Sequence, residues 1–451
     1  MNFILHTYGC QMNVRDSEAT EAMLTAAGHT RAVTEAEADL VIVNSCSVRG
    51  KAEDKAIGKL GLLCATKRER PNRIVGLMGC MAQRLGSNIF KKVPRLDFSV
   101  GTRRCGAIPR MVSRIIAGES HITEISSPDE IPDVPDAHLE QGFSAFVTIL
   151  LGCNRRCTYC IVPDVRGPEF SRPAREIIAE ISTLAHHGIK EITLLGQSVM
   201  NYGMANRAWL DDDPASAHGF TEPFSRLLEA VAAIPEIIRI RFTSGHPSGC
   251  TNELVRAVSL FPKICHHLHL PVQSGSDAIL AAMRRGYARA DYLDAVRRLR
   301  AVMPDFALTT DVIVGFPGET TEDFEETRRL MNQADFDNAF IFKYSPRPGT
   351  PAASLKDDVA MYEKMRRNQL LLADQDIRGE AANQRLVGSL QEVLVEGPSL
   401  RNATRWAGRS PGNKIVVFTP VAGILPGTLV NVRITRVAPQ TLYGEVLQKN
   451  G

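Results

Sequence analysis

The stretch GCNRRCTYC at residues 152–160 carries three closely spaced cysteines, Cys153, Cys157 and Cys160. It follows the apolar run SAFVTILLG at residues 144–152, whose composition is typical of a buried strand. The cysteines therefore lie on a loop at the carboxyl end of a predicted strand. On a tight loop, their spacing lets all three thiols reach one metal centre.

The pattern of an apolar run followed by an amphipathic segment continues through the middle of the chain. We count about six such pairs, the first of which has its helical segment at residues 174–187. Because crossovers between parallel strands are right-handed, these pairs predict a full or partial (β/α) barrel. Such a barrel keeps its active site at the carboxyl ends of the strands, where the cysteine loop lies.

The first hundred residues show the same alternation, which predicts a separate parallel α/β domain. Three of its apolar runs end in a cysteine, namely Cys10, Cys46 and Cys80. Ligands of open α/β sheets sit at the ends of the strands, so these thiols are expected to converge on a metal although they are far apart in sequence. Three buried, inert thiols at strand ends are the alternative.

Composition and periodicity predict that the chain has four parts. The N-terminal α/β domain is predicted at residues 1–118, and a linker rich in proline and aspartate at residues 119–138. The barrel is predicted at residues 139–382. Residues 383–449 contain about five short strands with Gly/Pro turns, which indicates a small all-β barrel.

The composition is that of an ordinary globular protein, with 451 residues, 44% of them hydrophobic. No run of 18 apolar residues and no secretory leader occur, so we expect a cytoplasmic protein without a membrane span, acting as a monomer. Its ten cysteines are then not expected to form disulfides. We expect four of them to be buried and inert: Cys64, Cys105, Cys250 and Cys265.

Positive charge gathers at the end of the chain. The net charge is only +3, yet the last 67 residues hold eight Lys/Arg against three Glu. A basic terminal module suits a polyanionic partner, although a solvated surface gives the same excess.

Three cysteines are one fewer than a four-iron cluster normally takes. One iron then lacks a protein ligand, and an open position on a metal marks a reacting site. An open iron on a low-potential cluster could bind and reduce S-adenosylmethionine, whose cofactor chemistry is radical generation. A zinc knuckle is the alternative, but no fourth Cys or His lies near the loop.

Several motifs resemble one known family. CNRRCTYC matches the CxxxCxxC loop of radical S-adenosylmethionine enzymes, and LGCNRRCTYCIVPDVRGPEFSRP resembles the methylthiotransferases in particular. The N-terminal domain has three stretches that resemble that family's auxiliary-cluster loops, namely TYGCQMNVRDSE, VNSCSVR and GLMGCMAQR. The match extends through the barrel in three further stretches, LHLPVQSGSDAIL, DVIVGFPGETTEDF and YSPRPGTPAA. The C-terminal barrel resembles a TRAM domain, an RNA-binding module.

The amino-acid sequences of two motifs indicate one branch of the family. GCQMN and LPVQSGSD are similar to the MiaB-like branch, which acts on tRNA adenosine, rather than to the branch that acts on a ribosomal protein. Ser198 is a departure, because the family usually has asparagine there.

The resemblance implies a reaction and its cofactors. A methylthio group is attached to C2 of N6-isopentenyladenosine next to the tRNA anticodon, with S-adenosylmethionine as both methyl donor and radical source. Two [4Fe-4S] clusters are implied, the radical cluster on Cys153, Cys157 and Cys160 and the auxiliary cluster on the N-terminal trio. The partners implied are tRNA, an electron donor and a sulfur source, the last two of unknown identity.

Residues at predicted strand ends are candidates for contacts to S-adenosylmethionine. They are Tyr159, Gln197, Ser244, Gln273 and Asp311.

Basic residues in or beside turns of the terminal barrel are candidates for tRNA binding, together with a tryptophan that either stacks on a base or packs. They are Arg401, Arg405, Trp406, Arg409 and Lys414.

Two other functions remain open at this point. One is methylthiolation of a ribosomal protein or of a differently modified adenosine. The other is a non-catalytic iron–sulfur electron carrier with an RNA-binding tail, although a carrier has no use for sites with only three cysteines.

Overall fold

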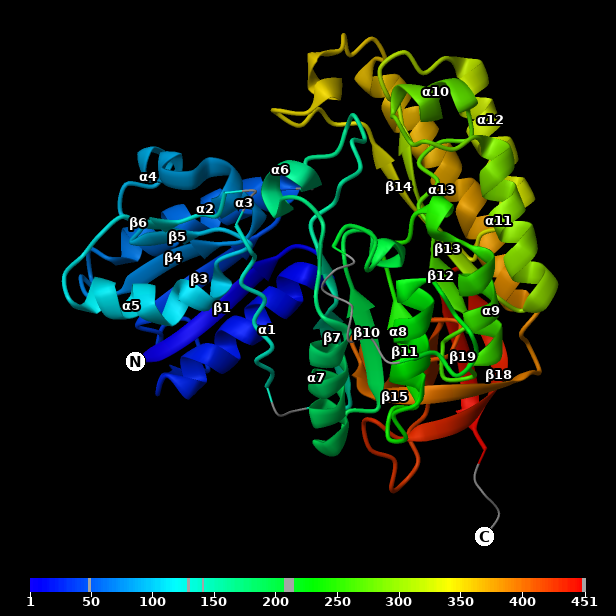
Figure 1. Cartoon of the computed structure of the whole chain (residues 1–451), viewed down its shortest axis with the longest axis horizontal. Coiled ribbons are helices and arrows are strands. Elements are labelled where there is room, and N and C mark those ends of the chain that lie inside the picture. The colour runs from blue at the N-terminus through cyan, green and yellow to red at the C-terminus, as the bar shows by residue number, and fades with distance from the viewer. Residues whose placement is uncertain (48–49, 128–129, 140–141, 207–214, 448–451) are drawn as a thin grey trace.

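A computed structural model describes residues 1–47, 50–127, 130–139, 142–206 and 215–447. In Figure 1, the N-terminal sheet and its helices lie at the left of the molecule, and a larger body of strands and helices lies beside them. A small barrel of strands lies below that body. The α/β class and the β-rich C-terminus predicted from the sequence are confirmed.

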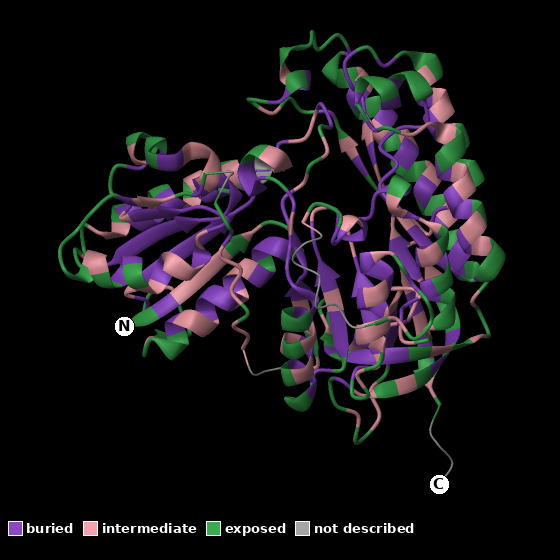
Figure 2. Cartoon of the chain, viewed as in Figure 1, coloured by how far each residue is buried: buried purple, intermediate pink, exposed green. Residues whose placement is uncertain are grey.

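The N-terminal sheet has six parallel strands in the order β2-β1-β3-β4-β5-β6. The strands are β1 (Asn2–Tyr8), β2 (Thr30–Arg31), β3 (Leu40–Ser45), β4 (Ile74–Met78), β5 (Phe98–Val100) and β6 (Ile122–Glu124). The helices are α1 (Gln11–Ala26), α2 (Gly50–Thr66), α3 (Cys80–Leu85), α4 (Ile89–Lys92) and α5 (Ile108–Ile116). Every residue of β3 and β4 is buried, as Figure 2 shows, because helices cover both faces of the sheet.

The stretch expected to be a linker takes part in the fold. Its residues 122–124 form β6, which pairs in parallel with β5 and buries Ile122 in the core of the sheet. Further on, the Arg15 guanidinium donates to the carbonyl oxygens of Pro135 and Ala137 at 3.1 and 2.8 Å. The expectation of a stretch without strand structure was therefore wrong at its beginning, where a short strand carries too few residues to show a period.

The central body is a partial barrel of six parallel strands. They are β7 (Ser144–Thr148), β10 (Glu191–Leu195), β11 (Arg239–Phe242), β12 (His267–His269), β13 (Ala307–Val314) and β14 (Asn338–Lys343). They form two three-stranded sheets, which a parallel bridge between Ile240 and Ile264 joins. Among the described strands, no pairing links β7 to β14, so the barrel is open on that side.

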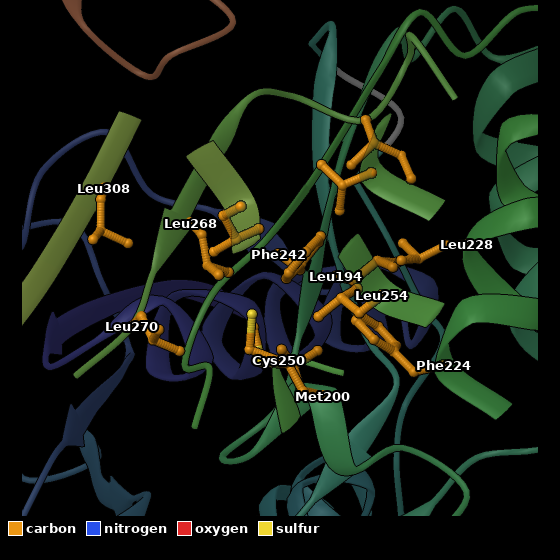
Figure 3. Packing of buried hydrophobic residues seen from close by; sticks show 14 of the residues in the cluster. Leu194, Met200, Phe224, Leu228, Phe242, Cys250, Leu254, Leu268, Leu270 and Leu308 are labelled. Atoms are coloured by element: carbon orange, nitrogen blue, oxygen red, sulfur yellow. The ribbon is translucent and has the colours of Figure 1, made fainter. Parts of the chain in front are cut away.

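Helices cover the outside of the partial barrel. They are α7 (Ala174–His186), α8 (Pro223–Ala232), α9 (Asn252–Leu260), α10 (Asp277–Ala282), α11 (Arg289–Val302) and α12 (Thr321–Ala334). The short helix α6 (Val162–Arg166) instead packs against the N-terminal domain, and a ribbon of β8 (Leu150–Leu151) and β9 (Phe170–Ser171) lies beside the cysteine loop. Figure 3 shows the main core, in which Leu194 and Phe242 of the strands meet Leu228 and Leu254 of the helices. This core fixes the strand ends that carry the site.

The C-terminal module is a closed five-stranded barrel in the order β15-β16-β17-β19-β18. The long helix α13 (Met361–Gln384) leads into β15 (Leu390–Ser399), β16 (Asn402–Arg409), β17 (Ile415–Phe418), β18 (Leu429–Ala438) and β19 (Thr441–Val446). Alternate residues of these strands fill its interior, among them Val393, Phe418 and Leu442.

This module is docked on the amino-terminal ends of the barrel strands. Arg239 donates to the carbonyl oxygen of Arg409 at 2.6 Å, and Arg241 donates to that of Ser410 at 2.9 Å. Arg241 also pairs with Glu191 at 2.8 Å, and both side chains of that pair are buried. The module therefore closes the end of the barrel that lies opposite to the cysteine loop.

No helix in the described part of the chain has the length and apolar character needed to cross a membrane.

Replacing Arg241 by alanine tests this docking. The change leaves the buried Glu191 carboxylate without its cation, which costs about 3 kcal/mol of unfolding free energy. Urea unfolding followed by circular dichroism measures the loss. Arg433→Ala is the control, because Arg433 is exposed on β18. Equal losses in the two variants would contradict the buried position of Arg241 between Glu191 and the C-terminal module.

Candidate active site

The three N-terminal cysteines lie at the carboxyl ends of neighbouring strands. Cys10 follows β1 and caps α1, Cys46 follows β3, and Cys80 begins α3 after β4. Because these strands are adjacent and parallel, their ends meet at one edge of the sheet. The Cys46 thiol hydrogen-bonds with both other thiols, so the structure brings the trio together.

Two of the three thiols in this trio have lowered pKa values, which favours their thiolate form. The pKa of Cys10 is lowered to about 5 and that of Cys80 to about 7, chiefly by the hydrogen bond from Cys46 and also by the positive charge of the Arg166 guanidinium. The pKa of Cys46 is raised, because its proton is held between the two other sulfurs. Thiolate is the form of cysteine that binds metals, so the trio is prepared for that role.

Two buried asparagines and a glycine hold the loops of the trio. The Asn13 amide donates to Asn44 Oδ1 at 2.9 Å, and the Asn44 amide donates back to the Asn13 carbonyl at 2.8 Å. Gly79 has φ +96°, and a Cβ there would lie 2.4 Å from the Asn44 side chain. Any other residue would push Cys80 away from its neighbours, since positive φ and this contact both require glycine.

The second trio lies on the loop after β8. Gly152 N–H donates to Gln197 Oε1 at 2.5 Å, and Thr158 donates through its hydroxyl to the Ala282 carbonyl at 2.9 Å. Burial raises the pKa of Cys153 and raises that of Cys160 to about 12. Negative charge on these two sulfurs is therefore unfavourable here unless cations or a metal offset it.

Arg285 supplies a cation to this second trio. Its guanidinium donates to Cys157 Sγ and to the Tyr159 hydroxyl, each at 3.3 Å. Arg285 is buried, and it was not among the residues expected from the sequence.

Helix α6 connects the two trios. It begins two residues after Cys160, and the side chains of Ile161 and Val165 pack against Cys80. Arg166 at its last position lies against Cys80 and pairs with Asp16 at 2.8 Å. In Figure 1, α6 accordingly lies beside α3. The two groups of thiols are thus neighbours across one short helix.

The residues expected to contact S-adenosylmethionine all lie on the cysteine loop or near the carboxyl ends of strands. Ser244 and Gln273 have φ of 61° and 73°, and Gln273 N–H donates to the Asp311 carbonyl at 2.9 Å. Gln197 and Tyr159 instead hold the cysteine loop through the bonds given above. Ser198 is buried, and its hydroxyl has no hydrogen-bond partner within the described residues.

The inner wall of the barrel carries further side chains that sequence reasoning missed. In β13 the even-numbered residues Leu308 to Val314 are buried toward the helices, so the half-buried Asp311 faces inward. Its register partner on β14 is Phe340, whose side chain is 48% exposed. The His269 ring meets Phe340 edge-on at 5.9 Å and lies 3.5 Å from the Asp311 carboxylate.

The residues expected to bind tRNA divide into two groups. Arg401 is exposed in the turn before β16, Arg405 is half-buried on β16, and Trp406 packs partly against the core of the small barrel. Arg409 instead pairs with Glu396 at 2.8 Å, and Lys414 pairs with Asp337 at 2.6 Å. The Lys414 bond joins the module to the central body, so it serves docking.

The remaining four cysteines are buried, as expected. Burial raises the pKa of three of them to about 11, which keeps the thiols protonated: Cys64, Cys250 and Cys265. Cys105 is buried and its pKa is raised for the same reason.

The donor atoms of the two trios fit a cluster better than a single ion. In the described ranges, no group of three or more Cys, His, Asp or Glu side chains is arranged to hold one metal ion. A [4Fe-4S] cluster sets a different requirement, because each thiolate binds its own iron. Three soft sulfur donors beside a buried guanidinium meet that requirement in both places.

Three family models match this chain. The Radical SAM superfamily matches residues 147–331, the uncharacterized protein family UPF0004 matches residues 2–101, and the TRAM domain matches residues 384–447. Among solved structures, the radical S-adenosylmethionine methyltransferase TsrM from Kitasatospora setae has a TM-score of 0.56 at 13% identity, over 78% of this chain and 74% of that one. That likeness concerns the fold alone.

Closer relatives extend along nearly the whole chain. The tRNA-2-methylthio-N(6)-dimethylallyladenosine synthase of Akkermansia muciniphila is 44% identical over 98% of this chain and 97% of its own length. The synthases of the same name from Opitutus terrae and Chromobacterium violaceum are each 42% identical over 98% of this chain, and over 97% and 98% of their own lengths. The two cysteine trios and this likeness agree: the chain belongs to the family of tRNA-2-methylthio-N(6)-dimethylallyladenosine synthases.

Proposed function

We propose that this protein attaches a methylthio group to C2 of N6-isopentenyladenosine next to the tRNA anticodon. The observation that carries the proposal is the pair of incomplete cysteine sites on either side of α6, in a chain of this family. The relatives named above bear the name of the tRNA enzyme, which favours this substrate over a ribosomal protein.

The reaction explains why two three-cysteine sites are needed. C2 of the adenine ring carries an unactivated hydrogen, and general acid–base groups, which contribute factors of about 10² to 10⁴, cannot remove it at a useful rate. The family uses [4Fe-4S] clusters and S-adenosylmethionine. A cluster with an open iron supplies the electron that cleaves S-adenosylmethionine and so provides radical chemistry.

The chain's own residues divide these tasks between the two sites. We assign Cys153, Cys157 and Cys160 to the radical cluster, since their loop lies at the carboxyl ends of the barrel strands. Cys10, Cys46 and Cys80 would hold the auxiliary cluster, which would supply the sulfur. The lowered thiol pKa values and the adjacent Arg166 support that assignment.

The part of the barrel from the end of β11 to β14 receives the small molecules. Ser244, Gln273 and Asp311 contact S-adenosylmethionine, while Gln197 and Tyr159 keep the cysteine loop in place. Phe340 stacks on the target adenine, because it is a large aromatic side chain left half exposed on the edge strand of an open barrel. The opening between β7 and β14 admits a base that is attached to RNA.

The tRNA is held by the exposed side of the small barrel. Arg401 and Arg405 meet phosphates, and neither has an ion pair with a carboxylate among the described residues. Trp406 supports this surface by packing beneath it. A low-potential one-electron donor and a sulfur source complete the reaction. We place the protein in the cytoplasm, because its substrate is tRNA.

Mass analysis of the nucleosides of bulk tRNA tests the function. Cells that lack this protein should accumulate N6-isopentenyladenosine and lose its 2-methylthio derivative, and the gene supplied in trans should restore it. Unchanged nucleosides together with a changed ribosomal protein would refute the tRNA assignment.

Single cysteine substitutions separate the two sites. Cys157→Ala should reduce S-adenosylmethionine cleavage to background, because it removes a ligand of the radical cluster. Cys46→Ala should leave 5′-deoxyadenosine production intact and abolish methylthio product. Cys64→Ala is the matched control, since Cys64 is buried in the same domain and outside the trio. Normal product from the Cys46 variant would contradict the role of the N-terminal site.

Replacing Phe340 by alanine tests the adenine site. Loss of one stacking platform costs about 1–3 kcal/mol, so kcat/KM for tRNA should fall by about 5-fold to 150-fold. Phe340→Tyr keeps the ring and should retain most of the activity. Cleavage of S-adenosylmethionine without tRNA should stay the same in both variants. An alanine variant with normal kcat/KM would exclude a stacking role.

A further inference from the structure

Arg285 is a buried guanidinium with an unusual set of partners. It follows α10 and is only 7% exposed. Nη1 donates to Cys157 Sγ and to the Tyr159 hydroxyl at 3.3 Å, Nη2 to the Pro271 carbonyl at 3.0 Å, and Nε to the Tyr287 hydroxyl at 3.0 Å. Each nitrogen of the guanidinium therefore has a partner, and the side chain is fixed in one position.

None of these partners is a carboxylate. Within the described part of the chain, no Asp or Glu oxygen lies within 4.0 Å of the Arg285 guanidinium. Arginine stays charged in proteins, and a buried cation without an anion costs several kcal/mol. A carbonyl oxygen is neutral and tyrosine hydroxyls ordinarily ionise only near pH 10, so at neutral pH the acceptor that carries a full negative charge is the sulfur of Cys157, when it binds a metal as thiolate.

The other trio offers a contrast. Arg166 beside Cys80 is also buried, but its charge is balanced by Asp16 at 2.8 Å. The two guanidinium groups therefore act differently on the sulfurs that they touch. Arg166 and Asp16 together are a neutral pair, whereas Arg285 adds a whole positive charge next to Cys157.

We propose that Arg285 is a positioning residue that sets the reduction potential of the radical cluster through its hydrogen bond to Cys157 Sγ. The proposal rests on the proposed function in one respect, namely that the loop of Cys157 holds this cluster. One electron from a low-potential donor makes the cluster more negative, and no bond forms or breaks at Arg285. A cation and a hydrogen bond at the sulfur stabilise the more negative state, so Arg285 raises the potential.

This role has a reason in the chemistry. S-adenosylmethionine is cleaved only after the cluster has accepted an electron, and the reduced fraction depends on the potential of the donor in the cell. Arg285 increases that fraction without a change in the donor. By bonding Tyr159 as well, it links the potential to the position of the loop.

The test is a redox titration of the cluster followed by electron paramagnetic resonance. The parent is the full chain in which Cys10, Cys46 and Cys80 are replaced by alanine, so that a single cluster gives the signal. Three substitutions are made separately in this parent: Arg285→Gln, Arg285→Lys and, as the matched control, Arg284→Gln. Arg284 is the neighbouring residue and is exposed. All variants are reconstituted anaerobically, their iron is counted, and dithionite with mediators sets the potential.

The expected result is a lower midpoint for Arg285→Gln. At the midpoint potential of the parent, its ratio of reduced to oxidised cluster should fall about tenfold, which corresponds to a shift of 59 mV for one electron. Arg285→Lys keeps the charge but loses the forked geometry, so its midpoint potential should lie between that of the parent and that of Arg285→Gln. The Arg284 control should match the parent.

Other outcomes overturn the proposal. A full iron content in Arg285→Gln with an unchanged midpoint excludes tuning by Arg285. If that variant binds no iron, Arg285→Lys decides, and a midpoint equal to that of the control counts against the proposal. Loss of iron in both variants would make Arg285 an assembly residue and refute a role in tuning. A parent without iron would instead refute the assignment of the cluster to Cys153, Cys157 and Cys160, which is a separate failure.

Discussion

Sulfur atoms gathered at the carboxyl ends of parallel strands are the constraint on which this structure depends. A parallel sheet brings residues that are distant in sequence to one edge, and the chain uses this twice. At the first sheet the edge collects Cys10, Cys46 and Cys80, and at the barrel it presents the loop of Cys157. Helix α6 lies between them, so the two edges face one region although they belong to different sheets.

Charge balance accounts for the residues around these sulfurs. Two partly buried thiolate sites need cations, and each has a buried guanidinium beside it. Arg166 comes from α6 and also ties the N-terminal domain to the barrel through Asp16. Arg285 comes from the opposite side of the barrel. The small C-terminal barrel stays away from both, because Arg239, Arg241 and Lys414 hold it at the other end of the strands.

Sequence patterns predicted much of this arrangement, for physical reasons. Strand–helix alternation is a local signal, so the two α/β parts and the five C-terminal strands could be recognised. The convergence of the N-terminal trio followed from the rule on strand ends. Arg285 and Phe340 could not be found in this way, because their roles depend on which residue of another strand or loop lies beside them. The partners of Arg409 and Lys414 were hidden for the same reason, and β6 was too short to show a period.

Incomplete ligation of both clusters is the central claim, and Mössbauer spectroscopy with an iron count tests it most directly. Anaerobically purified protein should contain about eight iron atoms per chain in two [4Fe-4S] clusters, each with one iron that differs from the other three. Addition of S-adenosylmethionine should alter the signal of a unique iron in one cluster. A count of four or fewer, or clusters in which every iron has a cysteine ligand, would contradict the account.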